Sequence, residues 1–241
     1  MWWSDLFTNM NPTDFFNFSF LPKYGTAFVR GIEYTFLLAV VSVLLAILPA
    51  LGLALMRLSR KKPVRWLSGA YIAVFRSTPM LVQLSIIYYG LFYAISLPRL
   101  TLFGFVDISR FIPGVVALAL NSSAYVAEIF RAGILAVDKG QAEAARSLGL
   151  SQWQSMRLVV LPQAVKNILP ALCNEFISTV KGTSLASVFF VGELMTSFKT
   201  VQSATFLALQ SLTIVGVIYF ILNFILSRLL KILERRLMVS D

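Results

Sequence analysis

The sequence lacks histidine altogether and contains a single cysteine, Cys173. Without histidine there is no imidazole for acid–base catalysis or for a histidine-ligated metal centre. One cysteine cannot form an intramolecular disulfide or a cysteine-rich zinc site. The chain also lacks the G-x-x-x-x-G-K-[ST] loop that cradles nucleotide phosphates. We therefore predict no catalytic residues, no metal site and no cofactor held by this chain.

Charged residues are also scarce, at 13% of the chain against about 25% in a typical soluble domain. Hydrophobic residues make up 58%, and the mean hydropathy is +0.78. The net charge of +10 is of a kind that can indicate nucleic-acid binding. Here, however, the basic residues form short clusters between long apolar runs, which is typical of a membrane protein. We therefore expect the protein to lie in a lipid bilayer and not to bind nucleic acid.

Five apolar segments are long enough to cross a bilayer, which takes about 20 residues per helix. The predicted fold class is therefore all-α, a polytopic helical membrane protein whose transmembrane domain covers residues 34–230. An amphipathic stretch precedes the second span, and Pro49 predicts a kink in the first. The five spans are 34–56, 79–97, 111–131, 168–190 and 205–226, and the amphipathic stretch is 66–78.

The basic clusters indicate the orientation of the chain. With five spans, the clusters at 57–65, 131–166 and 228–236 all fall on one side of the membrane. The positive-inside rule makes that side cytosolic, so we expect the N-terminus outside and the C-terminus inside. Residues 1–33 are then extracytoplasmic, with the aromatic stretch 1–22 on the bilayer surface, and residues 231–241 form a cytosolic tail.

The connection 131–166 is predicted to contain a first short helix over 141–148. Asp138 is a suitable N-cap, with Gln141 as its reciprocal partner in a capping box. Gly149 can adopt the left-handed conformation that ends such a helix. The connection is therefore expected to be structured.

A second short helix is predicted over 152–160. Ser151 and Gln154 have the spacing of a capping box, and Pro162 is expected to end the helix. Such a helix pair either docks another protein or packs beneath its own bundle, and the residues alone leave both alternatives open. The side chains available for either contact are Leu148, Leu150, Trp153 and Met156.

The same connection carries a spaced set of residues: Glu143, Ala144, Ala145, Gly149, Val159, Leu161 and Pro162. This set resembles the EAA loop of ATP-binding-cassette (ABC) importer permeases, in which isoleucine is usual where Val159 stands. Other stretches are similar to the polar amino-acid uptake branch of that family, and together they cover about residues 25–235. These stretches are 76–84, 123–128, 140–141, 161–164, 174–175 and 181–185.

The resemblance implies a non-catalytic permease subunit of a type I importer for a polar amino acid, in the plasma (inner) membrane of a prokaryote. It implies three protein partners: an ABC ATPase subunit that holds ATP and Mg²⁺, a second permease subunit (identical or homologous), and an extracytoplasmic solute-binding protein. Rigid-body motion would switch the permease between outward and inward states. The residues implied to couple it to the ATPase are Glu143, Ala144, Ala145, Gly149, Leu161 and Pro162.

Polar side chains within the spans are the candidates for substrate contact. A charge at bilayer depth costs at least ~2.5 kcal/mol, so such groups must face protein or water. Asn121, Tyr125 and Glu128 share one face of the third span. A buried carboxylate suits the ammonium group of an amino acid, which makes Glu175 the leading candidate. The full predicted set is Glu175, Asn174, Asn121, Ser122, Tyr125 and Gln83.

Structural roles remain open for the same residues. Glu175 could instead form an ion pair with Lys181, and the polar groups of the third span could form interhelical hydrogen bonds. We expect Glu128 to pair with Arg131 at the membrane edge. We expect Arg76 to hold lipid headgroups or a neighbouring loop.

Three alternative functions remain at this stage. Within the same family the cargo could be another small polar solute, because permeases for anions and sugars share the loop motif. A stand-alone secondary transporter driven by ions would need neither an ATPase nor a docking loop. A membrane-embedded enzyme is disfavoured by the missing histidine and the absence of paired catalytic acids.

Overall fold

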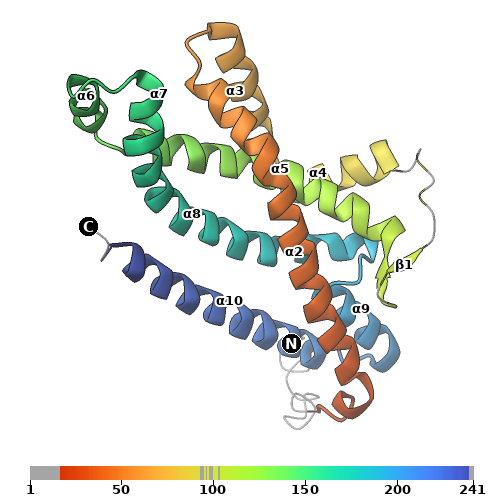
Figure 1. Cartoon of the computed structure of the whole chain (residues 1–241). Helices are drawn as coiled ribbons and strands as arrows, with labels where there is room; N and C mark the ends of the chain where they lie inside the picture. Colours follow the sequence, from red (N-terminus) through yellow and green to blue (C-terminus); the bar gives the residue numbers. More distant parts are fainter. Residues whose placement is uncertain (1–16, 93–94, 96, 98–99, 103, 239–241) are drawn as a thin grey trace, which may run out of the picture.

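The computed structural model describes residues 17–238, apart from 93–94, 96, 98–99 and 103. Most of the predicted interfacial stretch 1–22 therefore lies outside the described residues. Helices dominate the described part of the chain, and the only strands found there form a small antiparallel pair, β1 (Thr101–Leu102) and β2 (Val106–Asp107) (Figure 1). The prediction of an all-α protein is confirmed.

Four helical segments are long and apolar enough to cross a bilayer. A fifth crossing is made if α3 (Lys62–Ser77) and the helix that follows it, Met80–Phe92, count as one bent span. The latter consists of α4 (Met80–Ile86) and the π-helical η2 (Ile87–Phe92). The four segments are α2 (Leu21–Leu58), α5 (Ile108–Leu135), Gln152–Phe189 and α10 (Ala208–Met238).

The amphipathic stretch before the second span is a helix, as predicted, but the two helices do not continue in a straight line. They are bent by 108° at Thr78 and Pro79. Thr78 is extended, with φ −107° and ψ 146°, because a residue before proline avoids the helical region. The first span also starts earlier than predicted, since α2 begins at Leu21, and Pro49 lies inside it.

Pro162 does not end the second loop helix, which corrects the prediction. α7 (Gln152–Ser155), the π-helical η3 (Met156–Val160) and α8 (Leu161–Gly182) follow one another without a break. Pro162 directly follows the π-helical turn η3 inside this continuous segment, and lacks the N–H that would bond to the preceding turn. The loop helix and the fourth span are therefore one continuous rod, extended by the 3-10 helix η4 (Thr183–Phe189).

α5 lies at the centre of the bundle. In the most apolar part of α5, 61% of the residues are buried, against 17–33% in the other three candidate spans. Leu118 on α5 packs with Leu38 of α2 and Leu84 of α4 in one core cluster. In a second cluster the small residues Ala124 and Ala127 face α2, which allows the helix backbones to approach closely. α2 crosses α5 in Figure 1.

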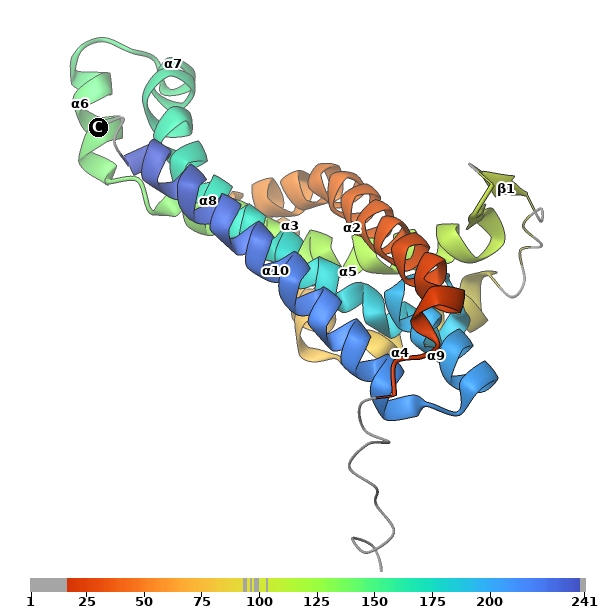
Figure 2. The same ribbon diagram turned by 90° about the horizontal axis from the view of Figure 1, so that it is seen from below.

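The remaining helices lie around this centre. α9 (Leu194–Thr205) packs against α2 and α10, and α10 runs beside α8 (Figures 1 and 2). The short helix α6 (Lys139–Ser147) and α7 project together from the body at the end where α5 finishes and α8 begins (Figure 1). Much of α10 presents apolar side chains outward, such as Phe220 and Phe224, as a lipid-facing or subunit-facing surface requires.

Candidate functional site: a polar hollow between α5 and α8

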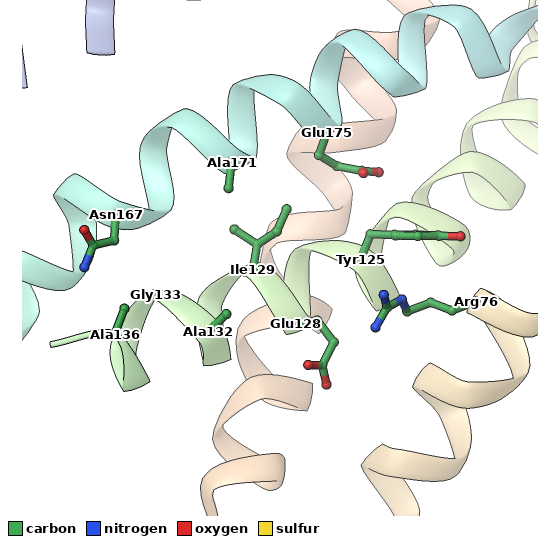
Figure 3. A pocket seen from close by; sticks show the side chains of 10 residues that line it. All are labelled: Arg76, Tyr125, Glu128, Ile129, Ala132, Gly133, Ala136, Asn167, Ala171 and Glu175. Carbon is green, nitrogen blue, oxygen red and sulfur yellow. The ribbon is translucent and has the colours of Figure 1, made fainter. Parts of the chain in front are cut away.

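Two adjoining hollows lie where α5 and α8 diverge next to the α3–α4 bend. The larger has a volume of about 500 Å³ and extends toward the α6–α7 end, and the smaller has about 200 Å³. Tyr125 and Glu175 line both hollows and so mark their junction (Figure 3). The smaller hollow is also lined by Thr78, Met80, Asn121, Ser122, Ser178 and Thr179.

Glu175 reaches into this junction from α8. The Thr179 hydroxyl, one turn further along the same helix, lies 3.5 Å from Glu175 Oε1 and 3.0 Å from the Glu175 carbonyl oxygen. The same hydroxyl is 3.0 Å from Ser122 Oγ on α5. Lys181 lines a different hollow beside α10, and among the described residues Glu175 has no ion pair. The structure therefore does not support the alternative of a Glu175–Lys181 pair.

Arg76, which is predicted to hold lipid headgroups or a neighbouring loop, is exposed and lies beside Tyr125 of α5. Its guanidinium Cζ lies 5.4 Å from the centroid of the Tyr125 ring, within the range of a cation–π contact. Figure 3 shows Tyr125 between Arg76, on the last turn of α3, and Glu175 on α8. Arg76 thus lines the larger hollow and brings a positive charge to it.

Gln83, by contrast, is occupied by structural contacts. Its Nε2 lies 2.9 Å from the Phe75 carbonyl oxygen, 3.0 Å from the Thr78 carbonyl oxygen and 2.7 Å from Thr78 Oγ1. Its Oε1 accepts a hydrogen bond of 2.8 Å from Asn121 Nδ2. Gln83 is 7% exposed and lines neither hollow. It holds the α3–α4 bend and fixes Asn121, which does line the smaller hollow.

Of the predicted substrate residues, the structure brings four together: Asn121, Ser122, Tyr125 and Glu175. Asn174 is exposed and lines neither hollow. The sequence analysis did not single out Thr179 or the pocket position of Arg76. The sequence spacing could have indicated Thr179, because it lies four residues after Glu175 and therefore on the same helix face.

A second buried carboxylate, Glu193, has a clear structural role between the spans. It is 0% exposed and caps α9, with Oε2 2.7 Å from Met195 N and Oε1 2.8 Å from Thr196 N. Tyr219 of α10 donates to Oε2 at 3.2 Å. Burial raises the pKa of this carboxyl to about 7, against the effect of these hydrogen bonds. All its oxygens are engaged, so it offers nothing to a ligand.

The α6–α7 loop has most of the predicted local geometry. Asp138 Oδ1 accepts from Gly140 N at 2.6 Å, Gly149 has φ +88°, and the Ser151–Gln154 capping box is complete. The predicted capping box between Asp138 and Gln141 is wrong. Gln141 Oε1 instead accepts a hydrogen bond of 3.3 Å from Gln163 Nε2 of α8. This contact ties the loop to the α8 rod.

Two large apolar side chains of the loop are exposed among mostly polar ones. Leu148 is 84% exposed and Trp153 is 70% exposed. Glu143 and Ala144 are also exposed, whereas Ala145 is buried at 4% against the rest of the loop. The Ser155 hydroxyl, 3.3 Å from the Ala142 carbonyl oxygen, clamps α7 to α6. The loop is thus internally fixed and exposes two large apolar side chains. Leu161 and Pro162, at the start of α8, are exposed too.

Within the described residues, no group of three or more Cys, Asp or Glu side chains is placed to hold a metal ion.

Comparison with known proteins gives consistent matches. The family of binding-protein-dependent transport system inner membrane components matches residues 42–239. The arginine transport system permease protein of Bacillus subtilis (strain 168) is 41% identical, covering 88% of this chain and 93% of that protein. The octopine transport system permease protein of Rhizobium radiobacter is 40% identical, and the match covers 91% of this chain and 89% of that protein.

A solved structure supports the same relationship. The crystal structure of an amino acid ABC transporter with histidines has a TM-score of 0.82 and 43% sequence identity, covering 91% of this chain and 98% of that chain. The chain therefore belongs to the family of binding-protein-dependent transport system inner membrane components, and it is a multi-pass, non-catalytic permease subunit of the ABC importer class.

Proposed function

We propose that this permease carries a polar amino acid and that the substrate binds at the junction of the two hollows. The observation that carries the proposal is the Glu175 carboxylate, which lines both hollows and has hydroxyl neighbours but no ion pair among the described residues. A carboxylate in a water-poor site gains most from a cationic partner. The α-ammonium group of an amino acid supplies one.

The other groups of the site suit the rest of such a molecule. Arg76 lines the larger hollow and can receive the α-carboxylate, since guanidinium groups pair well with carboxylates. Asn121 and Ser122 line the smaller hollow and offer hydrogen bonds to polar side-chain atoms. The named relatives transport different molecules, arginine and octopine, so the identity of the amino acid is a separate question.

The α6–α7 loop is proposed as the contact with the ATPase subunit that holds ATP and Mg²⁺. Its exposed Leu148 and Trp153 and its fixed internal geometry suit a docking surface. Glu143 and Ala144 lie open to such a partner, Gly149 forms the turn, and Leu161 and Pro162 begin the rod that leads to Glu175. Motion of the loop would therefore reach the substrate site through one continuous helix.

The remaining assignments follow the charge distribution and the family. We infer that the α6–α7 loop and the C-terminus are cytosolic and the N-terminus is outside. A solute-binding protein would deliver the amino acid at the outer face. A second permease subunit, identical or homologous, would cover the open side of the hollows.

The proposal is tested by Glu175→Gln in the assembled transporter. Loss of a charge-assisted hydrogen bond, worth about 1.5–3 kcal/mol, should reduce amino-acid uptake at least about tenfold. Membrane amount and ATP hydrolysis without substrate should stay unchanged. The neighbouring variant Asn174→Ala is the control and should transport normally, because Asn174 lines neither hollow. Normal uptake by Glu175→Gln would remove Glu175 from the substrate site.

A further inference from the structure

Four basic side chains are crowded into the turn between α2 and the start of α3. They are Arg60, Lys61, Lys62 and Arg65, here called the basic cluster, and all four are exposed. No acidic residue occurs anywhere in α3. Like charges this close in the chain repel one another, because salt screens them only weakly at short range. The basic cluster therefore gains from a negatively charged partner.

The described acids do not supply that negative charge. Glu128 of α5 is already engaged. Its expected pair with Arg131 is present, with Arg131 Nη2 2.8 Å from Oε2, and Arg57 Nε lies 3.6 Å from Oε1. The other ion pair of the described chain joins Arg110 to Asp107. None of the four side chains of the basic cluster forms an ion pair with a described residue.

The side chains that follow the basic cluster along α3 are apolar and exposed. Trp66 is 74% exposed, Leu67 59% and Val74 57%. The other side of α3 packs on the bundle, where the buried Ser68 hydroxyl donates to the Leu53 carbonyl oxygen of α2 at 2.7 Å. α3 thus has an uncovered apolar face that begins directly after the basic cluster.

The order of these groups matches the order of layers in one bilayer leaflet. At a rise of 1.5 Å per residue, Trp66 lies about 6 Å and Val74 about 18 Å along the helix axis from Lys62. Tryptophan is enriched between the headgroups and the acyl chains of a bilayer. Cations, indole ring and aliphatic side chains therefore follow one another as phosphate, interface and acyl chain do.

A bilayer covers both parts of this surface at once. α3 and the helix Met80–Phe92 are together long and apolar enough to form one bent span. The exposed apolar face of α3 then meets acyl chains, and the basic cluster lies at the level of the headgroups. An acidic protein surface would match the cations but would leave the apolar face without a partner.

We propose that the basic cluster binds the phosphate groups of anionic phospholipids, with Trp66 at the interface between headgroups and acyl chains. The leaflet is the one that the charge distribution makes cytosolic. Polybasic segments next to a membrane-spanning helix are attracted to anionic lipids, and ammonium and guanidinium groups donate charge-assisted hydrogen bonds to phosphate oxygens. The contact holds the α2–α3 turn at the membrane surface.

The test measures quenching of Trp66 fluorescence by brominated lipids in vesicles that contain the full-length chain. The other tryptophans, Trp2, Trp3 and Trp153, are replaced by phenylalanine. Brominated phosphatidylglycerol should bind beside Trp66 at least about tenfold more strongly than brominated phosphatidylcholine, since each basic residue contributes about fivefold. Lys61→Gln combined with Lys62→Gln should lower this preference to less than about threefold. High salt should act in the same direction, because it screens exposed charges.

Lys139→Gln combined with Arg146→Gln is the matched control. It removes the same charge from α6, which projects from the bundle, so the preference should change less than about twofold. Equal quenching of Trp66 by the two lipids overturns the proposal, as does an equal loss in the two double variants. Protection of Trp66 from both brominated lipids in the complex with the ATPase also overturns it, because a protein then covers the surface.

A second measurement applies if the chain without the other tryptophans does not accumulate. The phosphatidylglycerol that co-purifies with the assembled transporter, all tryptophans retained, is then counted by mass spectrometry. Its amount should fall in the variant of Lys61 and Lys62 and stay at the wild-type level in the variant of Lys139 and Arg146. Equal amounts in all three proteins would contradict lipid binding by the basic cluster.

Discussion

At the scale of single residues, Gln83 and Glu175 show why similar sequence contexts carry different roles. Each is a polar residue in an otherwise apolar run. Gln83 is surrounded by the Phe75 and Thr78 carbonyl groups and by Asn121, so its hydrogen-bonding capacity is used. Glu175 faces open space in two hollows. The difference lies in what surrounds each group, which local sequence does not encode.

We expect Gln83→Leu to destabilise the protein. The variant leaves Asn121 and the carbonyl groups of the bend without a partner, at about 1–3 kcal/mol for each buried group. In detergent the melting temperature should fall by at least about 3 °C, since each kcal/mol shifts it by about 2–4 °C in a chain of this size. Ser85→Ala, on the same helix, is the control and should melt like the wild type. Weaker substrate binding at an unchanged melting temperature would contradict the structural role.

The candidate site was predictable in part, for reasons visible in its residues. Asn121, Ser122 and Tyr125 lie on adjacent positions of one helix face, and Glu175 is a lone acid in an apolar run. Asn174 and Glu175 are neighbours in sequence but point about 100° apart on a helix, so only the packing of α8 decides which one lines the hollow. Arg76 lines the hollow from the last turn of α3, directly before the 108° bend. The sequence patterns did not predict this bend.

At the scale of helices, two prolines that look alike in sequence have opposite effects. Pro79 follows an extended Thr78 and marks a sharp bend, whereas at Pro162 the helix continues without a break from the preceding π-helical turn. A π-helical turn precedes Pro162, and such turns occur within continuous helices. The uninterrupted rod from α7 to η4 is what connects the loop to Glu175.

Variants of Gly149 test whether the geometry of the turn between α6 and α7 matters for transport. With φ +88° it adopts a conformation that costs other residues about 1–2 kcal/mol, although a Cβ there would meet nothing within 4 Å. Gly149→Ala should therefore reduce ATP-dependent uptake while the chain still inserts. Gly149→Asn should retain more uptake, because asparagine tolerates this conformation better. Equal uptake in wild type and Gly149→Ala would show that the turn geometry does not limit coupling.

For the whole molecule, the exterior of the bundle is apolar and the polar hollows lie beside the central helix α5. α5 is enclosed by the other helices, and outward-facing positions of α2 and α10 are apolar. The hollows lie on an open side of the single chain, which is the side expected to meet the second permease subunit. The α6–α7 loop projects at one end of the bundle (Figure 1).

Labelling of single cysteines tests the orientation of this arrangement. In a Cys173→Ser background, Arg60→Cys and Gln152→Cys should react with an impermeant maleimide only from the cytosolic side. Both native residues are exposed and belong to the basic side of the chain. Ser203→Cys, exposed on α9, should react only from outside. Labelling of Gln152→Cys from outside the cell would invert the topology and exclude ATPase coupling through the loop.

The sequence by itself determined the membrane class, the helical fold, the capped helices of the loop and the family. Hydrophobic length, charge clusters and helix caps depend only on residues that are close together in the sequence. Only the tertiary structure decided which polar groups face the hollow and that Gln83 holds the α3–α4 bend. These features depend on helix rotation and bending, which are set by packing between segments far apart in the chain.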